Sequence, residues 1–199
     1  MKSSTFAARD VVLGDGSVGH IRPLAAADRD ALVEGFDSLS PESRIRRFFF
    51  EKKALSDQEL HSLTHPDGVD HIALGLAVAI EGRPEQLPIG VARCFRSQED
   101  PTLAEVALIT RDDWQGAGAG TALMQALAEA AWNVGIRRWV GALFCDNHTI
   151  RHLLSRVGDL SEDRVIASGV VEVICELHPP GDHDGPCPLG LAPPTIAQA

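Results

Sequence analysis

Apolar and polar residues follow two different periods along this chain, and the period changes where the structural elements are expected to change. Residues 71–80 form a nearly continuous apolar run, which is typical of a strand covered on both faces of a sheet. Residues 25–39 instead carry Leu32, Val33 and Phe36 at helical spacing. We therefore expect a helix there, packed on a sheet.

The same reasoning extends over residues 17–177. Strands are expected at residues 17–23, 88–95, 104–110, 137–144, 164–168 and 170–177, and a helix at residues 148–157 that Gly158 stops. A long Ala/Leu-rich helix separates the strands at 104–110 and 137–144, which implies a right-handed parallel crossover between them. Residues 1–16 are expected to form a loose arm or an edge hairpin, and the Pro-rich residues 178–199 a flexible tail.

Two serines mark helix starts. Ser40 precedes a proline that suits the first helical position, and Ser56 with Glu59 forms a capping box. The helix after Ser40 contains RIRRFFF, which allows two interpretations. The arginines contact substrate or phosphate, or the aromatics fill the core while the arginines stay solvated; the second is favoured because charge runs are usually solvated faces.

Composition narrows the class of protein. The 199 residues suit one domain with a formal net charge of −10, which opposes nonspecific binding to nucleic acid and favours cationic partners such as amines. No apolar run reaches the ~20 residues of a membrane span, and no signal-like segment opens the chain. No membrane partner is therefore expected, and a cytoplasmic location is the default.

The cysteines and histidines predict no metal site. Cys94, Cys145 and Cys175 lie in or at the end of apolar runs, where reduced, buried thiols are expected, and Cys187 lies in the tail. His61 and His65 are four residues apart but lack the glutamate of an H-E-x-x-H motif.

The central chemical motif is a set of three alternate glycines, Gly116, Gly118 and Gly120, between an apolar strand and a long helix. Glycines at this point leave backbone N–H groups free to face a ligand, and the helix dipole adds positive potential. An anion-binding loop is therefore expected. The alternative is an ordinary strand-to-helix connection, but three alternate glycines argue against it.

The sequence around the glycines indicates which class of phosphate-bearing ligand the loop binds. No lysine follows the glycines, which argues against a loop that binds nucleoside triphosphates. Thr121 stands where a dinucleotide fold needs its third glycine, although Asp146 remains a passable ribose partner for that alternative. Gln115 and the glycines spell Q-x-x-G-x-G after a strand, which resembles the acyl-coenzyme A pyrophosphate motif of the GNAT superfamily of N-acetyltransferases.

Further segments strengthen this resemblance. IRPL, LSPESRIRRFFF, AEVAL and WQGAGAGTAL occur in the order found in the acetyltransferase domain of Pat-type protein lysine acetyltransferases. The resemblance implies an α+β fold of three α/β/α layers over about residues 17–177. Its central sheet is mixed and mostly antiparallel, with splayed parallel strands and flanking helices.

The resemblance also implies acetyl-CoA as the cofactor and assigns residues to it. Backbone groups of one strand would bond the pantetheine amides, and N–H groups of the glycine loop would hold the pyrophosphate. The Asn147 side chain would meet the pantetheine, although its position suits a helix cap equally well. The cofactor-binding residues are thus Leu108, Ile109, Thr110, Gln115, Gly116, Ala117, Gly118, Ala119, Gly120, Thr121 and Asn147.

Glu105 is the candidate catalytic residue. Acyl transfer needs a neutral amine, and therefore a base that removes a proton. Glu105 interrupts an apolar strand, so partial desolvation is expected, and the resemblance points to the same residue. The alternative is a glutamate on an exposed strand face or paired with an arginine. In many GNAT enzymes a tyrosine protonates the leaving thiolate, and this chain has Leu154 at that position. The alternatives are protonation by Ser155, His152 or water, or departure of the thiolate without an acid.

The expected function is that of an acetyl-CoA-dependent N-acetyltransferase acting on a primary amine by direct attack. The Pat-like segments favour a protein lysine as the acceptor. The alternatives are a small-molecule amine, such as a polyamine or aminoglycoside-like compound, and a noncatalytic acyl-CoA-binding module. The sequence is compatible with a homodimer but does not determine the oligomeric state.

Overall fold

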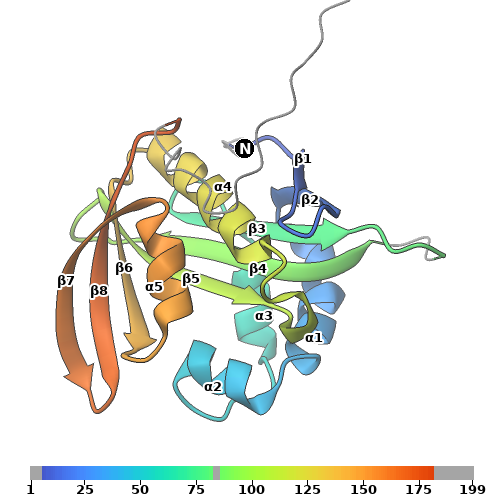
Figure 1. Ribbon diagram of the computed structural model, residues 1–199, viewed down its shortest axis with the longest axis horizontal. Coiled ribbons are helices and arrows are strands. Elements are labelled where there is room, and N and C mark those ends of the chain that lie inside the picture. Colours follow the sequence, from blue (N-terminus) through green and yellow to red (C-terminus); the bar gives the residue numbers. More distant parts are fainter. Residues whose placement is uncertain (1–5, 83–85, 182–199) are drawn as a thin grey trace, which may run out of the picture.

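The computed structural model describes residues 6–82 and 86–181, which form an eight-stranded sheet with helices on both faces (Figure 1). The strand order is β1-β2-β3-β4-β5-β6-β8-β7, and the pairing is antiparallel throughout except between β5 and β6. The predicted α+β fold with a mixed, mostly antiparallel sheet is confirmed. Among the described helices, none is both long and apolar enough to cross a membrane.

The strands are β1 (Arg9–Val12), β2 (Val18–Pro23), β3 (His71–Val78), β4 (Leu87–Arg96), β5 (Leu103–Thr110), β6 (Arg138–Phe144), β7 (Gly158–Ala167) and β8 (Val170–Leu177). The α-helices are α1 (Arg29–Asp37), α2 (Pro41–Phe48), α3 (Asp57–Thr64), α4 (Ala119–Asn133) and α5 (His148–Ser155). Short 3-10 helices precede α1 (η1, Ala26–Asp28) and the glycine loop (η2, Asp112–Trp114).

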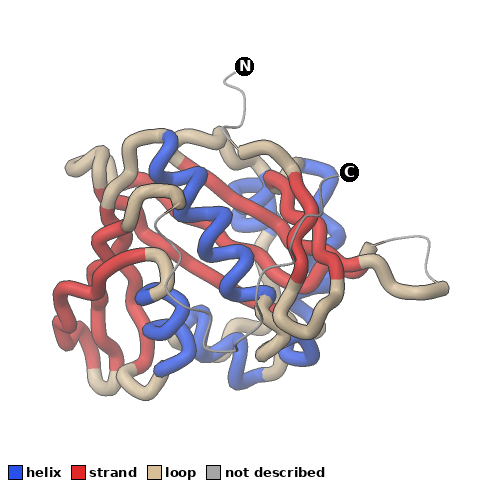
Figure 2. The backbone as a smooth tube through the Cα atoms, turned by 45° about the horizontal axis from the view of Figure 1, so that its top comes forward, coloured by secondary structure: helices blue, strands red, loops and turns tan. Residues whose placement is uncertain are grey.

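Helix α4 lies across one face of the sheet, against β3, β4 and β5, while α1 and α3 cover the opposite face (Figures 1 and 2). Ala and Leu are strong helix formers, and in α4 their side chains also pack against the sheet. Leu123 and Leu127 are fully buried, and the small side chains of Ala126, Ala130 and Ala131 let the helix come close to the sheet. The main core therefore lies beneath α4.

Helices α2, α3 and α5 are capped by their own side chains. The Ser40 hydroxyl accepts from the Ser43 N–H at 3.1 Å, and the predicted capping box of Ser56 and Glu59 is present. Helix α4 differs, because its N-cap residue is Gly118, which has no side chain to offer. The first N–H groups of α4 are therefore left without a side-chain cap.

Two element boundaries were predicted wrongly at the carboxyl end of α5. The helix ends at Ser155, and β7 starts at Gly158 rather than at residue 164. A Cβ at Gly158 would lie 2.2 Å from the Glu176 carbonyl oxygen, so the glycine permits a close approach of β7 to β8. Most described side chains of β7 are exposed, so this edge strand lacks the apolar alternation that would reveal it.

The cysteine predictions are confirmed for two positions and wrong for one. Cys94 and Cys175 are buried, and burial raises the pKa of each thiol to about 12. Cys145 is exposed, because β6 ends at Phe144 and the chain turns there toward α5. Cys187 lies outside the described residues.

The amino-terminal residues contribute to the sheet. Residues 9–12 pair with residues 18–21 as an edge hairpin, which is one of the two forms expected for that segment. Residues 1–5 and 182–199 lie outside the described part of the chain. The predicted domain boundaries after residues 16 and 177 therefore stay predictions.

Candidate active site

Strands β5 and β6 separate after three residue pairs. Leu103, Ala104 and Glu105 of β5 pair with β6, and no pair follows, while β5 stays paired with β4 as far as Thr110. The two strands run apart beyond that point (Figure 1). The edge of β5 that faces β6 therefore has no strand partner over residues 106–110, and its backbone groups face the gap.

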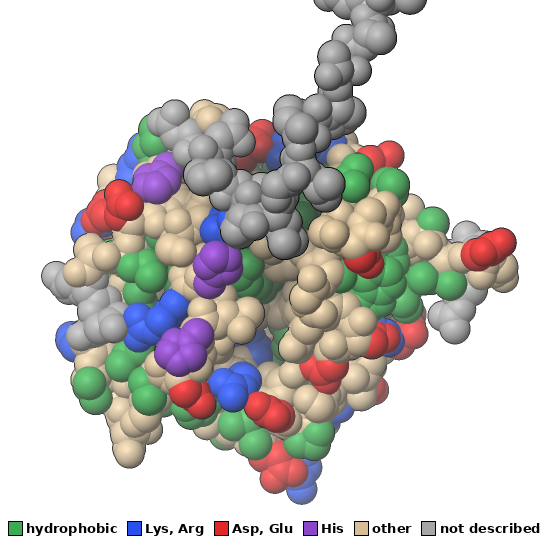
Figure 3. All heavy atoms as spheres, viewed as in Figure 1, with side chains coloured by type: hydrophobic (Ala, Val, Ile, Leu, Met, Phe, Trp, Pro, Cys, Tyr) green, Lys and Arg blue, Asp and Glu red, His purple; other side chains and the backbone are tan. Residues whose placement is uncertain are grey.

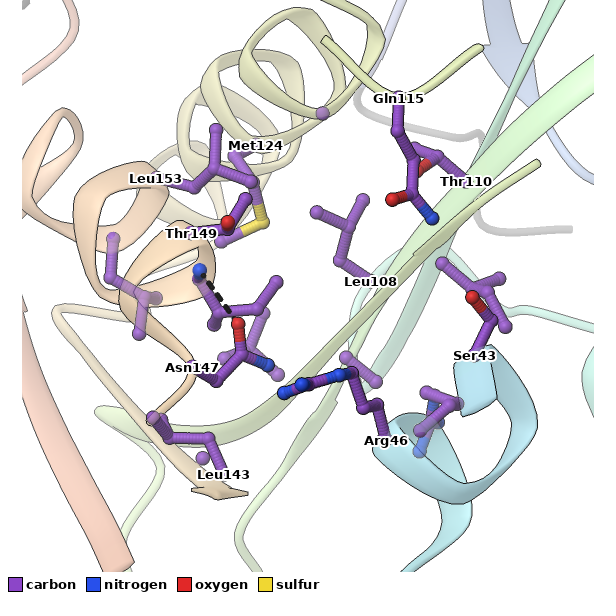
Figure 4. Close-up of a pocket in the computed structure, with 18 of the residues that line it drawn as sticks. Ser43, Arg46, Leu108, Thr110, Gln115, Met124, Leu143, Asn147, Thr149 and Leu153 are labelled. Atoms are coloured by element: carbon purple, nitrogen blue, oxygen red, sulfur yellow. Dashed lines mark hydrogen bonds between the residues drawn. The ribbon is translucent and has the colours of Figure 1, made fainter. Parts of the chain in front are cut away.

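This gap is the floor of a cleft of about 610 Å³, a size suited to a small-molecule ligand. Figure 3 shows a hollow in the face drawn, with basic and acidic side chains on its rim. Residues from β5, the glycine loop, β6, α5 and α2 line it (Figure 4). Glu105, Leu108, Ile109, Thr110, Gln115, Gly116, Gly118, Gly120, Thr121 and Asn147 are among them, so most of the predicted site residues meet in one place.

The three glycines serve different structural purposes. Gly116 and Gly118 adopt φ values of 82° and 91°, which side chains other than that of glycine rarely tolerate. Gly120 has ordinary backbone angles, but a Cβ there would lie 3.0 Å from Leu153 Cδ1 of α5. The first two glycines shape the loop, and the third lets α4 approach α5.

The loop presents free donors. Within the described chain, the backbone N–H groups of residues 116–121 donate no hydrogen bond, whereas the Gln115 N–H is taken by the Asp112 carbonyl at 3.3 Å. Six N–H groups at the start of an uncapped helix form an anion site. On the other side, the Ala117 carbonyl accepts from the Gly14 N–H at 2.8 Å, which ties the loop to the β1–β2 turn.

Asp112 connects this loop to α2, and sequence reasoning did not identify it. Its carboxylate accepts from the Ser40 N–H at 2.7 Å, from the Ser43 hydroxyl, and from the Gln115 side chain at 2.9 Å. Burial opposes the charge of Asp112, but the hydrogen bonds from Ser43 and Ser40 outweigh it and lower the pKa of the carboxyl group. Gln115 thus acts through its side chain as a brace of the loop.

Asn147 fills the cap position and still faces the cleft. Its Oδ1 accepts from the Ile150 N–H at 3.3 Å, as drawn in Figure 4. Its amide N–H groups donate no hydrogen bond to a described residue. The two interpretations of Asn147 are therefore compatible, because the cap uses the oxygen and leaves the nitrogen for a ligand.

Arg46 reaches across the cleft from α2 toward Asn147 (Figure 4). Its guanidinium pairs with Glu42 at 3.0 Å and with Asp146 at 3.3 Å. Asp146, the ribose partner of the dinucleotide alternative, is thus already engaged by a side chain of this protein.

Glu105 lies on the cleft wall beside Arg47. It is exposed and makes no hydrogen bond or ion pair with a described residue, so the expected partial desolvation is wrong for the protein alone. Burial lowers the pKa of Arg47, and the charge of Glu105 acts in the opposite direction. The alternative of an exposed glutamate near an arginine therefore describes its surroundings, and any desolvation must come with a bound substrate.

The RIRRFFF segment forms the expected helix but distributes its side chains differently. Phe49 and Phe50 are 39% and 57% exposed, whereas Arg47 lines the cleft, so the favoured interpretation is wrong. Phe49 takes the left-handed conformation at the end of α2 (φ 64°), which turns the following residues away from the core.

The substitutes named for the missing tyrosine acid lie outside the cleft. His152 and Ser155 are exposed and do not line it, and the Ser155 hydroxyl donates to the His152 carbonyl at 2.9 Å. Leu154, at the tyrosine position, is buried on the cleft wall. Of the three candidates for the acid, only water is left.

Comparison with known proteins agrees with this geometry. The sequence profile of the Acetyltransferase (GNAT) family matches residues 36–158. Acetyltransferase Pat of Mycolicibacterium smegmatis is 33% identical over 139 residues, which make up 70% of this chain and 40% of that protein. An acetyltransferase of Pseudomonas aeruginosa is 31% identical over 162 residues, 79% of this chain and 86% of the relative. This chain thus spans less than half the length of the mycobacterial relative.

Solved structures give the same result. The GNAT domain of S. lividans PAT superposes with a TM-score of 0.74 at 30% identity, covering 85% of this chain and 97% of that one. YncA of Salmonella typhimurium, a putative acetyltransferase solved with acetyl-CoA, has a TM-score of 0.62 at 17% identity, covering 80% and 94%, which shows a shared fold. The resemblance seen in the sequence is confirmed, and the chain belongs to the GNAT family of acetyltransferases, which use acetyl-CoA as cofactor.

Proposed function

We propose that this chain transfers the acetyl group of acetyl-CoA to the side-chain amine of a protein lysine, with Glu105 as general base. The observation that carries the proposal is the position of Glu105, the last residue of β5 that pairs with β6 before the strands separate. A carboxylate at that point lies in the same cleft as the free N–H groups of the glycine loop. The Pat-like segments of the sequence favour a protein lysine as the acceptor.

The residues present fit the coenzyme. The N–H groups of residues 116–121 would hold the pyrophosphate, and the unpaired edge of β5 at Leu108, Ile109 and Thr110 would bond the pantetheine amides as a neighbouring strand would. The amide nitrogen of Asn147 would donate from the opposite wall. When bound, acetyl-CoA supplies the thioester that the amine attacks.

The other half of the cleft receives the acceptor. We call the half lined by α2 and Glu105, together with the adjoining sheet face of β3, β4 and β5 that carries Glu105, the acceptor side. The half lined by the glycine loop and the β5 edge is the coenzyme side. A lysine has a reference pKa of about 10.4, so its amine arrives protonated at neutral pH. Glu105 removes that proton directly or through water, which frees the lone pair for attack. The new carbon–nitrogen bond would form as the carbon–sulfur bond breaks, and coenzyme A would leave as the thiolate or with a proton from water.

The decisive substitution is Glu105→Gln. We expect turnover to fall by about 10²–10⁴-fold while the dissociation constant for acetyl-CoA stays within about twofold, because a base is lost and the coenzyme contacts remain. Glu99→Gln is the matched control, since Glu99 is exposed in a turn outside the cleft. Full turnover by the Glu105 variant at neutral pH would remove Glu105 from the role of base.

The acceptor class needs a separate experiment. Labelled acetyl-CoA is incubated with the protein and with lysine peptides, polyamines and aminoglycosides in parallel. Labelling of peptides at the lysine side chain supports the proposal, and labelling of small amines alone contradicts it. Calorimetry that detects acetyl-CoA binding without transfer to any amine would indicate a noncatalytic binding module.

A further inference from the structure

Arg47 differs from the other two arginines of α2. Arg44 donates to backbone carbonyl groups, and Arg46 pairs with two carboxylates. Arg47 lines the cleft next to Glu105 but donates no hydrogen bond to a described residue, and its contact is with the Phe48 ring, 5.1 Å from the guanidinium carbon. An arginine in a cleft with its donors unused is arranged to bind something that the protein itself does not supply.

A second buried cation lies beside it. Strand register places Arg93 of β4 between Ala73 and Ala107, whose small side chains leave room for it on the acceptor side. Arg93 is 6% exposed, and its hydrogen bond to the Leu63 carbonyl is long, at 3.5 Å. Burial, followed by the positive charge of Arg47, lowers the pKa of Arg93 to about 10, so it remains charged at neutral pH.

The charges in this region do not balance. Arg47 and Arg93 both lie close enough to influence each other, and Glu105 is the carboxylate that acts on Arg47. Asp67 is also near, but it acts on His71 and is held by three backbone N–H groups. Poorly solvated cations without a full set of acceptors are costly, and an incoming anion offsets that cost.

We propose that Arg47 forms a carboxylate-binding subsite on the acceptor side, so that the enzyme prefers amines that carry an acidic group close to the reacting nitrogen. The proposal rests on the proposed function, because it concerns the acceptor of the same reaction. A guanidinium binds a carboxylate through two parallel hydrogen bonds. Glu105 stands next to the subsite and takes the amine, so one acceptor presents its two charged groups to two adjacent side chains.

The surrounding surface favours the same partner. Five of the 18 Lys and Arg residues lie between residues 44 and 53, where Glu51 is the single acidic residue, although the whole chain has a net charge of −10. This basic segment includes the end of α2 and the exposed Phe49 and Phe50. Arg46 and Lys52 are paired with carboxylates, so the positive charge that this rim offers to an acidic segment of an acceptor is that of Arg44, Arg47 and Lys53.

The experiment compares matched acceptors. The first pair is a lysine peptide with Glu or Gln beside the lysine, and the second is Nα-acetyl-lysine or its C-terminal amide. The first pair tests an acidic neighbour in a peptide, and the second tests the carboxylate of the acceptor itself. The measured quantity is the ratio of kcat/KM for the acidic member to that for the neutral member.

Wild-type enzyme is expected to prefer the acidic member of at least one pair by about tenfold, the size expected for a charge-assisted hydrogen bond. Arg47→Gln should bring that ratio to about one, because the acidic member loses its hydrogen-bonding partner and the neutral member had none to lose. Arg47→Lys keeps the positive charge but loses the two parallel N–H donors of the guanidinium, so it should give an intermediate ratio. Lys53→Gln removes the same charge from an exposed neighbour outside the cleft and should keep most of the ratio, because Lys53 adds long-range attraction but no hydrogen bond in the cleft.

A ratio of one in the wild type for both pairs, or a full ratio in Arg47→Gln, overturns the proposal. Failure of the proposed function has a different signature, because no peptide or amine would then be acetylated. In that case the subsite is tested by calorimetry, which compares the binding of the acidic and neutral peptides to the coenzyme A-bound protein. Preferential binding of the acidic peptide that Arg47→Gln abolishes supports the subsite, and equal binding refutes it.

Discussion

The two halves of the cleft are built from different parts of the polypeptide. The coenzyme side uses backbone, because residues 116–121 offer unbonded N–H groups and β5 offers an unpaired edge. The acceptor side uses side chains: Arg47 of α2 and Glu105 line the cleft, and the strand register puts Arg93 and His71 on the same sheet face as Glu105. Backbone donors suit a ligand that never changes, whereas side chains can differ between enzymes of one fold that act on different acceptors.

The two halves also differ in what they cost the folded protein. The coenzyme side leaves helix-terminal N–H groups exposed to water, which satisfies them without a ligand. The acceptor side holds Arg93 buried, and Arg47 and His71 half-buried. We therefore expect the acceptor side to dominate the response of stability to pH and to charge removal, and the coenzyme side to dominate cofactor affinity.

The largest expected effect is acid lability through His71. Burial, with the positive charge of Arg93, lowers the pKa of His71 from 6.5 to about 4, and its buried Nε2 has no hydrogen-bond partner among the described residues. The unfolded chain takes up this proton near pH 6.5 and the folded protein does not. This contribution to stability is therefore complete above that pH and lost as the pH falls toward 4, by up to about 3 kcal/mol.

Urea unfolding at several pH values between about 7 and 4.5 measures this loss. His71→Phe is the matched variant, because the His71 ring stacks on Phe95 at 4.1 Å and a phenyl ring keeps that contact without a proton to gain. Its stability should fall less steeply with acid than that of the wild type. If the free energy of unfolding falls equally steeply with acid in both proteins, groups other than His71 cause the acid lability.

The next largest effect concerns Gly118 on the coenzyme side. Gly118→Ala forces a side chain into the left-handed region and places its Cβ 2.7 Å from the Gly14 nitrogen. A cost of about 2 kcal/mol is expected, and it distorts the loop that holds the pyrophosphate, so affinity for acetyl-CoA should fall by at least about tenfold.

Gly120→Ala is the matched control for this loop. Its Cβ would meet only the ends of leucine side chains, Leu153 Cδ1 at 3.0 Å and Leu108 Cδ2 at 3.4 Å, and its backbone angles are ordinary. It should retain most of the affinity that Gly118→Ala loses in calorimetry. Equal losses in both variants would mean that general packing, rather than the shape of the loop, controls cofactor binding.

Arg93→Met should stabilise the protein. Methionine fills a similar volume without a charge, and removing a poorly compensated buried cation raises the free energy of unfolding by on the order of 1–2 kcal/mol. Arg93→Lys keeps the charge and should give no such gain. Chemical denaturation without ligands measures both, and a less stable methionine variant would show that the contact with the Leu63 carbonyl outweighs the burial of charge.

The smallest effect separates the two roles of Asn147. Asn147→Asp keeps an oxygen for the helix cap and loses the amide donor, so acetyl-CoA should bind about fivefold more weakly at unchanged stability. Asn147→Ala should lose the same affinity and about 1 kcal/mol of stability as well. Calorimetry and thermal unfolding distinguish them, and unchanged affinity in both variants would leave the cap as the only role.

The same contrast explains what the sequence could predict. The glycine loop is encoded locally, because Gly116 and Gly118 are needed for the backbone angles and the helix follows directly. The capping box of Ser56 was equally predictable, since all of its partners lie within four residues. Backbone-built features therefore left a pattern in the sequence that could be recognised.

The acceptor side left no such pattern. RIRRFFF is compatible with either face of α2 packing inward, and the outcome for Arg47 depends on how α2 meets β5 and β6. The surroundings of Glu105 were predicted wrongly for the same reason, although its position on β5 was right. Asp112 was missed because its partners Ser40 and Ser43 are about 70 residues away in sequence.

The hydrogen bond between the Gly14 N–H and the Ala117 carbonyl has a consequence for the dynamics of the edge hairpin. Any ligand that restrains the glycine loop also restrains the β1–β2 turn, because the two backbones share this contact and the close approach of Gly14 to Gly118. Slower amide hydrogen exchange at the amino-terminal hairpin would therefore report occupancy of a site more than 100 residues further along the chain.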